Sequence, residues 1–457
     1  MTAISQTAQR AKRVARIYRD MREQTGNPFS ALYYVARLIT QRLPVAARQA
    51  RSVARHKADV QKIMDMRTKA GNQMPFLGIK FTGGLGDALV VARFLRDLSA
   101  HVGGFDFDIY CSQSGRAQWV FGAVEGLRDC YDDLLFDFTL SDYDLAARVN
   151  QFVTFYENSA RWTHLRSHPK LVEAACNAIR FRPTIEPFIE NHPYMDSYLA
   201  QKAVYANRNR ADFLHSMVGI PYGGDRLNLP VTAGMAERHG LTPGRYVTIH
   251  NGFDPDFFTA SGQATKCYPH FGAVVALLRQ KRPDLRFVQI GVATSQPLDN
   301  VDLNLIDQTS LKEAAGLIGG ALLHVDNEGG LVHLARCLGV DSCVVFGPTP
   351  SNYFGYAGNV NIDPTFCGGC WWNNKTWMDQ CPRGFQTARC MTEQSPQSVA
   401  VAIDRHLSGK AASRQAIQDK PRLVRPITGT VWSAEQALPD QADTGHNAKW
   451  ASHVTTR

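Results

Sequence analysis

Residues 326–348 hold the side chains and glycines that most clearly predict a binding site. The segment begins with an acidic turn ending at Glu328, continues with Gly329 and Gly330, and carries His333 one turn into an expected helix. Glycines before a helix N-terminus let a ligand approach the backbone, and the free N–H groups there bind anions. An acidic side chain at the same turn can accept hydrogen bonds from a sugar. Together these features predict a site for a nucleotide-linked substrate at the carboxyl edge of a parallel sheet.

A second glycine-rich turn contains Gly83, Gly84 and Gly86 and leads from an expected strand into an expected helix. Its glycine spacing differs from the dinucleotide-binding fingerprint, and Asp87 follows the last glycine. Two interpretations of Asp87 stand. It is a helix N-cap, which stabilises by about 1 kcal/mol, or a general base aimed into a cleft.

Two further groups allow a structural and a functional interpretation. Thr265 and Lys266 precede an expected helix, so Lys266 either holds a phosphate together with the helix amides or is an ordinary surface charge. His333 is either a structural helix residue or a functional group, and the acid and two glycines before it favour function.

Four of the ten cysteines fall within 24 residues, at Cys367, Cys370, Cys381 and Cys390. Four thiolates can close a tetrahedral site around zinc or iron. The alternatives are disulfides, which a reducing compartment disfavours, and four unpaired cysteines in a buried loop.

These residues must be positioned by strands and helices that alternate along the chain, which predicts parallel sheets with right-handed crossovers. The first series is expected to contain strands over 76–82, 105–111 and 134–138 and helices over 87–98 and 117–127. The second is expected to contain strands over 246–250, 285–290, 321–325 and 342–346 and helices over 270–282 and 311–318. The predicted fold class is therefore α/β, with two Rossmann-like domains that face each other across a cleft.

The first 70 residues form a basic head, with 15 of the 50 Lys and Arg residues but only 4 of the 41 acidic ones. Helices broken at Pro28 and Pro44 are expected there. A basic amphipathic head suits an anionic membrane face or a partner, and it equally suits a solvated helical hairpin. No nucleic-acid-binding motif is present, so no nucleic-acid partner is expected.

Composition bounds the remaining organisation. With 44% hydrophobic residues, no run near the ~18 apolar residues of a membrane span and no apolar signal-peptide core, the chain is expected to be cytoplasmic. The head leaves a peripheral position at the inner membrane face open. We expect a basic helical extension, two Rossmann-like domains and a disordered tail, with boundaries at 1–74, 75–230, 231–410 and 411–457.

Taken together, the motifs resemble glycosyltransferase family 9, the ADP-heptose heptosyltransferases, over about residues 76–403. The likeness depends on the Gly-Gly-Leu-Gly-Asp87 turn, the Thr265-Lys266 pair and the Gly330-Leu-Val-His333-Leu-Ala run with Phe-Gly-Pro-Thr349 after it. The Cys-x-x-Cys-Trp segment is similar to the branch that modifies autotransporter proteins and carries an iron held by four cysteines.

The resemblance implies a GT-B fold, with the N-terminal domain for the acceptor and the C-terminal domain for the donor. It also implies inverting transfer from a nucleotide sugar without a required cofactor. Asp87 matches the family's proposed general base, Lys266 the residue that holds the donor pyrophosphate, and His333 the motif histidine beside the phosphates. The other residues expected to bind substrate are Gly83, Gly84, Gly86, Thr265, Glu328, Gly329 and Gly330.

One departure from the family pattern concerns the acidic residue five positions before the histidine. The family usually has an aspartate there, whereas this chain has Glu328, and Asp326 lies two residues earlier. The sugar is therefore left open, although ADP-heptose is the expected donor. The acceptor is a lipopolysaccharide core sugar, another glycan or a protein serine, and the oligomeric state, homo-oligomers included, is also left open.

Two competing hypotheses belong to other classes. The first is a non-catalytic scaffold, stapled by iron or zinc at its four cysteines and docked to a membrane or partner through the basic head. The second is an NAD-dependent oxidoreductase, which the absence of G-x-G-x-x-G after either first strand argues against.

Overall fold

The computed structural model describes Tyr18, Arg22 and residues 28–412, except residues 256, 258, 260 and 261. Helix α2 (Pro28–Lys69) belongs to one compact unit, and the residues from Gln73 onward, which include both sheets, belong to another. Of the helices in this described part of the chain, none has the length and apolar content needed to cross a bilayer.

Helix α2 runs without interruption through Pro44, so the break predicted there is wrong. A proline withholds one backbone hydrogen bond, and a helix of 42 residues continues past that loss. The tail expected from residue 411 lies almost entirely outside the described residues, as does most of the helical pattern over residues 10–21.

The first sheet has the strand order β3-β2-β1-β4-β5, and only β5 is antiparallel to its neighbour. Its strands are β1 (Phe76–Phe81), β2 (Asp106–Tyr110), β3 (Leu127–Tyr131), β4 (Leu145–Val149) and β5 (Val153–Phe155). Its helices are α3 (Leu85–Val102), α4 (Ser114–Phe121), α5 (Trp162–Leu165), α6 (Pro169–Phe181), α7 (Glu186–Glu190), α8 (Asp196–Tyr205) and α9 (Phe213–Val218). Because β1 and β4 are parallel neighbours, the residues that follow Phe81 and Val149 emerge at the same edge of the sheet.

The strand predicted over residues 134–138 is wrong. Residues Asp133–Phe138 form a 3₁₀ helix, and the Asp132 side chain caps it by accepting a hydrogen bond from the Leu134 N–H at 2.9 Å. Leu134 is 60% exposed and Phe138 50%, whereas Phe136 is fully buried against Tyr110 of β2, so only one side chain of the apolar run packs on the sheet core. The third strand is instead β3, an edge strand of mixed composition, and short apolar runs alone do not separate helix from strand.

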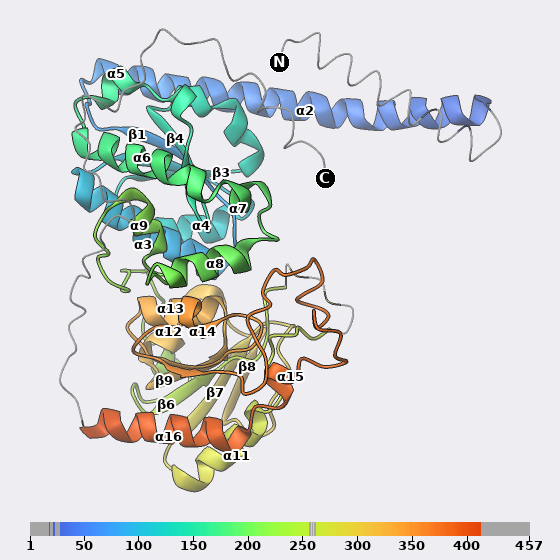
Figure 1. Cartoon of the computed structure of the whole chain (residues 1–457), viewed down its shortest axis with the longest axis vertical. Coiled ribbons are helices and arrows are strands. Elements are labelled where there is room, and N and C mark those ends of the chain that lie inside the picture. The colour runs from blue at the N-terminus through green and yellow to red at the C-terminus, as the bar shows by residue number, and fades with distance from the viewer. Residues whose placement is uncertain are drawn as a thin grey trace. The chain divides into compact units, whose positions relative to one another are not determined.

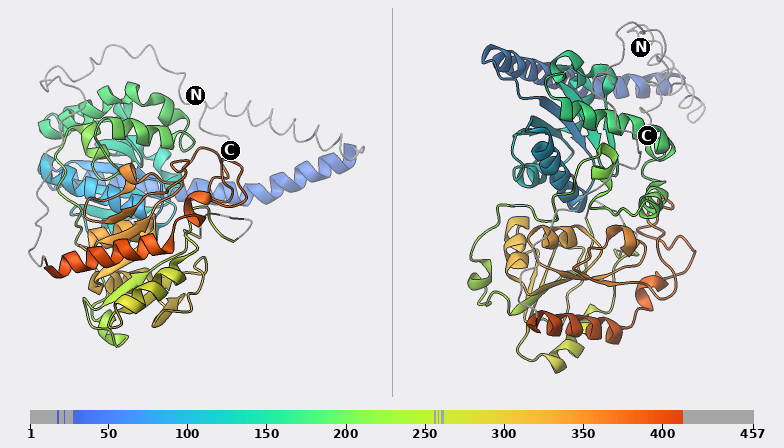
Figure 2. Two further views of the ribbon diagram at one scale, coloured as in Figure 1. Left: turned by 60° about the horizontal axis from the view of Figure 1, so that its bottom comes forward. Right: turned by 60° about the vertical axis from the view of Figure 1, so that its left-hand side comes forward.

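The second sheet is parallel throughout, with the order β11-β10-β9-β6-β7-β8. Its strands are β6 (Tyr246–Ile249), β7 (Arg286–Gly291), β8 (Leu303–Ile306), β9 (Leu323–Asn327), β10 (Ser342–Val345) and β11 (Val360–Ile362). Its helices are α10 (Met235–Arg238), α11 (Phe271–Lys281), α12 (Leu311–Gly320), α13 (Gly330–Cys337), α14 (Ser351–Phe354), α15 (Arg389–Thr392) and α16 (Pro396–Ala412). Helices α12 and α13 cover one face and α11 and α16 the other (Figure 1), an arrangement also visible in the right-hand view of Figure 2. The two parallel sheets confirm the predicted α/β fold with two Rossmann-like halves.

Asp225, just before the segment that joins the two sheets, ties the halves together. Its carboxylate pairs with Arg93 of α3 at 3.1 Å and with Arg336 of α13 at 2.7 Å. The Arg93 side chain is fully buried. Burial alone would raise the pKa of Asp225, but Arg93 and Arg336 outweigh this effect and hold the pKa below its ordinary value.

Replacing Asp225 with asparagine is therefore expected to destabilise the protein by about 3–5 kcal/mol at pH 7, because the buried Arg93 charge loses its carboxylate. The stabilisation is present above about pH 4, the pKa in the unfolded chain, and is lost as the pH falls through the lower folded pKa. Urea unfolding at pH 7 and pH 3 measures both, and the difference between variant and parent should shrink at pH 3. Asp284→Asn is the control, because Asp284 and Arg245 are both more than 70% exposed and 3.9 Å apart. Equal losses in the two variants would contradict the assignment.

Candidate active site

The N-termini of α3 and α13 converge on one place, and glycines make this approach possible. A Cβ on Gly86 would lie 2.6 Å from the His333 ring, and one on Gly330 would lie 3.2 Å from the Gly86 nitrogen. Any side chain at either position would therefore push the two helices apart. Both helices direct unpaired backbone N–H groups and a partial positive charge toward this point, which suits an anion.

Asp87 is the third residue of α3 and performs part of the capping role. One carboxylate oxygen accepts a hydrogen bond from the Gly84 N–H at 3.3 Å. The other accepts from Gln151 Nε2 and from the Arg210 guanidinium, both at 2.9 Å. The side chain remains 28% exposed and lines a cavity, so the cap and the general-base interpretations are compatible.

Arg210 is only 1% exposed and also donates to the Asn150 carbonyl at 3.0 Å. The ion pair with Arg210 holds the Asp87 carboxylate in one position in the cavity lining. Sequence reasoning missed Arg210 and Gln151, which lie 123 and 64 residues from Asp87 along the chain.

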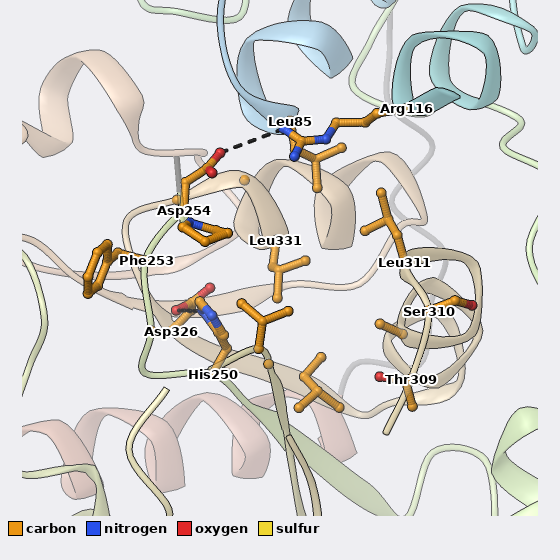
Figure 3. Close-up of a pocket in the computed structure, with 18 of the residues that line it drawn as sticks. Leu85, Arg116, His250, Phe253, Asp254, Thr309, Ser310, Leu311, Asp326 and Leu331 are labelled. Atoms are coloured by element: carbon orange, nitrogen blue, oxygen red, sulfur yellow. Dashed lines mark hydrogen bonds and ion pairs between the residues drawn. The ribbon is translucent and has the colours of Figure 1, made fainter. Parts of the chain in front are cut away.

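A cavity of about 560 Å³ lies between the two halves, with mostly apolar walls that include Ile290, Val292 and Leu311. Thr309 and Ser310 add hydroxyl groups to its lining. Figure 3 shows Thr309, Ser310 and Leu311 on one side of the cavity, with His250 and Asp326 on the other. The mixed lining suits a planar, largely apolar group with a few polar edges.

His250 follows β6 and is held by the buried Asp326, which is 1% exposed. Asp326 pairs with His250 Nδ1 at 2.8 Å and with His324 Nε2 at 3.3 Å. Burial alone would raise the pKa of Asp326, but the two histidines outweigh this effect and hold the pKa below its ordinary value. Because Nδ1 faces the carboxylate, it carries a hydrogen, and the imidazole is held in one orientation. Asp326 lies two residues before Glu328, which occupies the position of the acid five residues before His333. Both Asp326 and Glu328 line this cavity.

Across the rim of this cavity, Arg116 of α4 and Asp254 form an ion pair at 3.6 Å (Figure 3). Arg116 belongs to the first half and Asp254 to the loop that follows β6, so the pair bridges the halves.

A second cavity, of about 390 Å³, adjoins the first. Both are lined by Leu85, Asp254, Lys266, Glu328, Gly329 and Gly330. Asp87, His333, Gly83, Gly84 and Gly86 line only the second. The structure therefore brings together every residue predicted to bind substrate except Thr265, and it places Lys266 at the junction of the two cavities.

His333 is oriented by a hydrogen-bond chain that ends at Arg93. The Arg93 guanidinium donates to the Tyr356 hydroxyl at 2.7 Å, and that hydroxyl lies 2.6 Å from His333 Nδ1. Because Arg93 can only donate, Tyr356 is free to give its own hydrogen to Nδ1. This arrangement favours the hydrogen on Nε2, which faces Glu328 Oε1 at 3.7 Å.

Residues 257–365 match the family model described as glycosyltransferase family 9 (heptosyltransferase). The match covers less than half of the chain, and it shows a similarity of this segment to that family.

Solved structures similar to this chain have low sequence identity to it. The ADP-heptose lipopolysaccharide heptosyltransferase II of E. coli is 15% identical, with a TM-score of 0.46, over 74% of this chain and 100% of that chain. A family 9 glycosyl transferase from Veillonella parvula is 13% identical, with a TM-score of 0.42, over 73% and 97%. The iron-containing dodecameric glycosyltransferase TibC of enterotoxigenic E. coli is 16% identical, with a TM-score of 0.46, over 75% and 80%. No curated protein matches the chain.

Thr265 lies outside the lining of both cavities. Its hydroxyl donates to the Trp377 carbonyl at 2.6 Å, and its N–H donates to the Met378 carbonyl at 2.8 Å. Thr265 therefore anchors the cysteine-rich segment 367–390 beside Lys266, and the structure does not place it against a substrate.

The four cysteines of segment 367–390 influence one another electrostatically. Burial first, and then the neighbouring Cys367, Cys370 and Cys381, raise the pKa of the Cys390 thiol to about 12. Cys370 is raised to about 11 by burial and by Cys381 and Cys367. Among the described residues, however, no group of three or more His, Cys, Asp or Glu side chains has the spacing of a metal site. The four thiols thus share a neighbourhood, and their role as ligands stays a prediction.

Proposed function

We propose that this protein is a glycosyltransferase that transfers a heptose from an ADP-activated donor to an acceptor hydroxyl, with inversion at the anomeric carbon. The supporting observation is the pair of adjoining cavities with Lys266 at their junction and Asp87 in the second alone. This is the order in which a nucleotide, its diphosphate, the sugar and the acceptor hydroxyl must follow one another.

In this proposal, the adenosine occupies the first cavity, against its apolar walls. The diphosphate lies at the junction, where Lys266 and the backbone amides at the start of α13 carry fixed positive charge. Glu328, 8% exposed, accepts hydrogen bonds from hydroxyls of the sugar. The anomeric carbon then faces the second cavity.

Asp87 removes the proton from the acceptor hydroxyl as the acceptor oxygen bonds to the anomeric carbon. The bond between that carbon and the diphosphate oxygen breaks at the same time, and ADP leaves with the electron pair. Attack opposite the leaving group inverts the anomeric configuration. Lys266 and the α13 amides stabilise the negative charge that grows on the departing diphosphate.

The test is incubation of the purified chain with ADP-heptose and lipopolysaccharide, glycan and peptide acceptors, followed by mass spectrometry and anomeric analysis of the products. Calorimetry measures donor binding separately. Heptose transfer with an inverted linkage supports the proposal. Binding of a different nucleotide sugar in preference to ADP-heptose would overturn the donor assignment, and a retained linkage would overturn the direct displacement.

We also propose that Cys367, Cys370, Cys381 and Cys390 hold one structural iron or zinc ion. Four thiolates form a donor set suited to either ion, and the four cysteines fall within 24 residues of the chain. The ion would stabilise segment 367–390 and takes no part in the displacement.

Metal analysis of the purified protein is expected to find about one iron or zinc per chain. Cys390→Ser should lose the metal and lower the melting temperature, because metal binding supplies folding free energy. The matched control is Cys176→Ser, which replaces a buried cysteine of α6 outside the segment. Metal-free protein as isolated, or equal metal loss in both variants, would refute the site.

A further inference from the structure

The second cavity has an aromatic wall, formed by Trp371, Trp372, Trp377, Phe257 and Phe354. Trp372 is half-buried, and its ring centroid lies 5.9 Å from Trp377, 6.2 Å from Phe257 and 6.1 Å from Tyr194. Its backbone φ of 51° lies in the left-handed region that a tryptophan rarely adopts. The surroundings hold Trp372 in this conformation at an energetic cost, a pattern typical of ligand sites.

Three buried polar groups around the same cavity lack hydrogen-bond partners within the described part of the chain. They are the side-chain oxygen of Gln151, the hydroxyl of Thr349 and the indole N–H of Trp377. The three residues are at most 6% exposed. Buried polar groups are nearly always paired. An unpaired acceptor, an unpaired donor and an unpaired hydroxyl around one cavity therefore indicate a ligand with hydroxyl groups, which both donate and accept.

The charges of this lining disfavour an anionic acceptor. Four carboxylates face the cavity, from Asp87, Asp196, Asp254 and Glu328. Lys266 is the single Lys or Arg of the lining among the described residues, and it also lines the donor cavity. Asp87 and Asp254 are already paired with Arg210 and Arg116. An acceptor phosphate or carboxylate would therefore find no cation of its own, because these arginines are engaged and Lys266 is proposed to hold the donor diphosphate.

The lining also disfavours an extended polypeptide. Such a ligand is usually held along an exposed strand edge or in a helix groove. None of the described lining residues belongs to a strand. The three unpaired polar groups are neutral, and Trp372 lines the cavity with a half-buried ring. Both features suit a sugar ring, which has hydroxyls on its rim and C–H groups on its face.

We propose that the acceptor is an uncharged sugar, whose ring stacks on Trp372 while its hydroxyls form hydrogen bonds with the three unpaired polar groups of Gln151, Thr349 and Trp377. One further hydroxyl reaches Asp87. This assignment rests on the proposed transfer reaction and names its acceptor class. It also assigns a role in acceptor binding to the cysteine-rich segment, because Trp371 and Trp372 directly follow Cys370 and line the second cavity.

The test uses the full-length protein, ADP-heptose and three probes of acceptor class. These are uncharged nitrophenyl hexosides, the matching hexoside 6-phosphates, and a capped serine-rich peptide. Transfer to the neutral hexosides is expected. Trp372→Ala should raise their KM about tenfold with kcat within about threefold, and Trp372→Phe should restore most of the affinity. Thr349→Val, which removes a hydroxyl but keeps the side-chain shape, should raise the KM about three- to tenfold.

Trp162→Ala is the matched control, since Trp162 is a half-buried tryptophan outside both cavities. Quenching of tryptophan fluorescence by neutral hexosides in the ADP-saturated protein tests binding without turnover. Preference for the phosphorylated sugar or the peptide overturns the inference, as does an unchanged KM or quenching in Trp372→Ala. Failure of ADP-heptose to bind in calorimetry would instead overturn the proposed function, and the quenching experiment would still decide the acceptor class.

Discussion

Replacing Asp87 with asparagine is expected to lower kcat by about 10²- to 10⁴-fold, while donor affinity stays within about twofold. The reason is that an amide cannot remove the proton from the acceptor hydroxyl, and general-base catalysis typically contributes a rate factor of this size. Asp87 lines only the second cavity, so its loss should leave the nucleotide site intact. Steady-state kinetics with ADP-heptose and calorimetry with ADP measure the two effects separately.

The asparagine also tests whether Asp87 acts only through structure. Its single side-chain oxygen can replace only one of the two carboxylate oxygens, so it accepts either from the Gly84 N–H or from Arg210 and Gln151, and the buried guanidinium loses its countercharge. A thermal unfolding curve for each variant separates lost stability from lost chemistry. His192→Gln is the comparison, because His192 is another candidate base in the lining of the second cavity and its Nδ1 lies 2.9 Å from Asp196. Near-normal turnover in Asp87→Asn, with the loss transferred to His192→Gln, would reassign the base.

The glycine-rich turns could be predicted from sequence because their physical causes are local. Gly83 has a φ of 144°, and a Cβ there would lie 2.6 Å from the Asp87 Cβ. The helix after each turn follows directly in the sequence, so the anion-binding ends of α3 and α13 were recognisable. That the two ends meet, with Gly86 against His333, required the tertiary structure.

The partners of these residues could not be predicted, because they come from distant parts of the chain. Arg210 reaches Asp87 across 123 residues, and the register of β6 beside β9 brings His250 to Asp326 across 76. One signal was available for His250, which stands at the end of a predicted strand, where ligands of parallel sheets bind. Arg210 and Gln151 carried no such signal, since neither belongs to a recognisable motif.

Replacing Lys266 with alanine is expected to weaken binding of ADP-heptose about 10- to 100-fold. A charge-assisted hydrogen bond is worth about 1.5–3 kcal/mol, and in the proposed complex Lys266 bonds to the diphosphate. No ion pair or hydrogen bond of Lys266 exists among the described residues, so the ammonium group is available to an anionic ligand. Because the same charge also stabilises the departing diphosphate, kcat should fall as well.

Calorimetry with ADP-heptose, ADP and adenosine measures this role. The loss should be similar for the two diphosphates and small for adenosine, which lacks the charge that Lys266 is proposed to hold. Raising the ionic strength should weaken diphosphate binding strongly in the parent and less in Lys266→Ala, because salt screens the lysine charge that the variant lacks. Lys170→Ala, an exposed lysine at the start of α6, is the matched control and should leave all three affinities unchanged. Equal affinity for ADP-heptose in Lys266→Ala and its parent would remove Lys266 from the diphosphate site, and with it the order of groups along the two cavities on which the displacement depends.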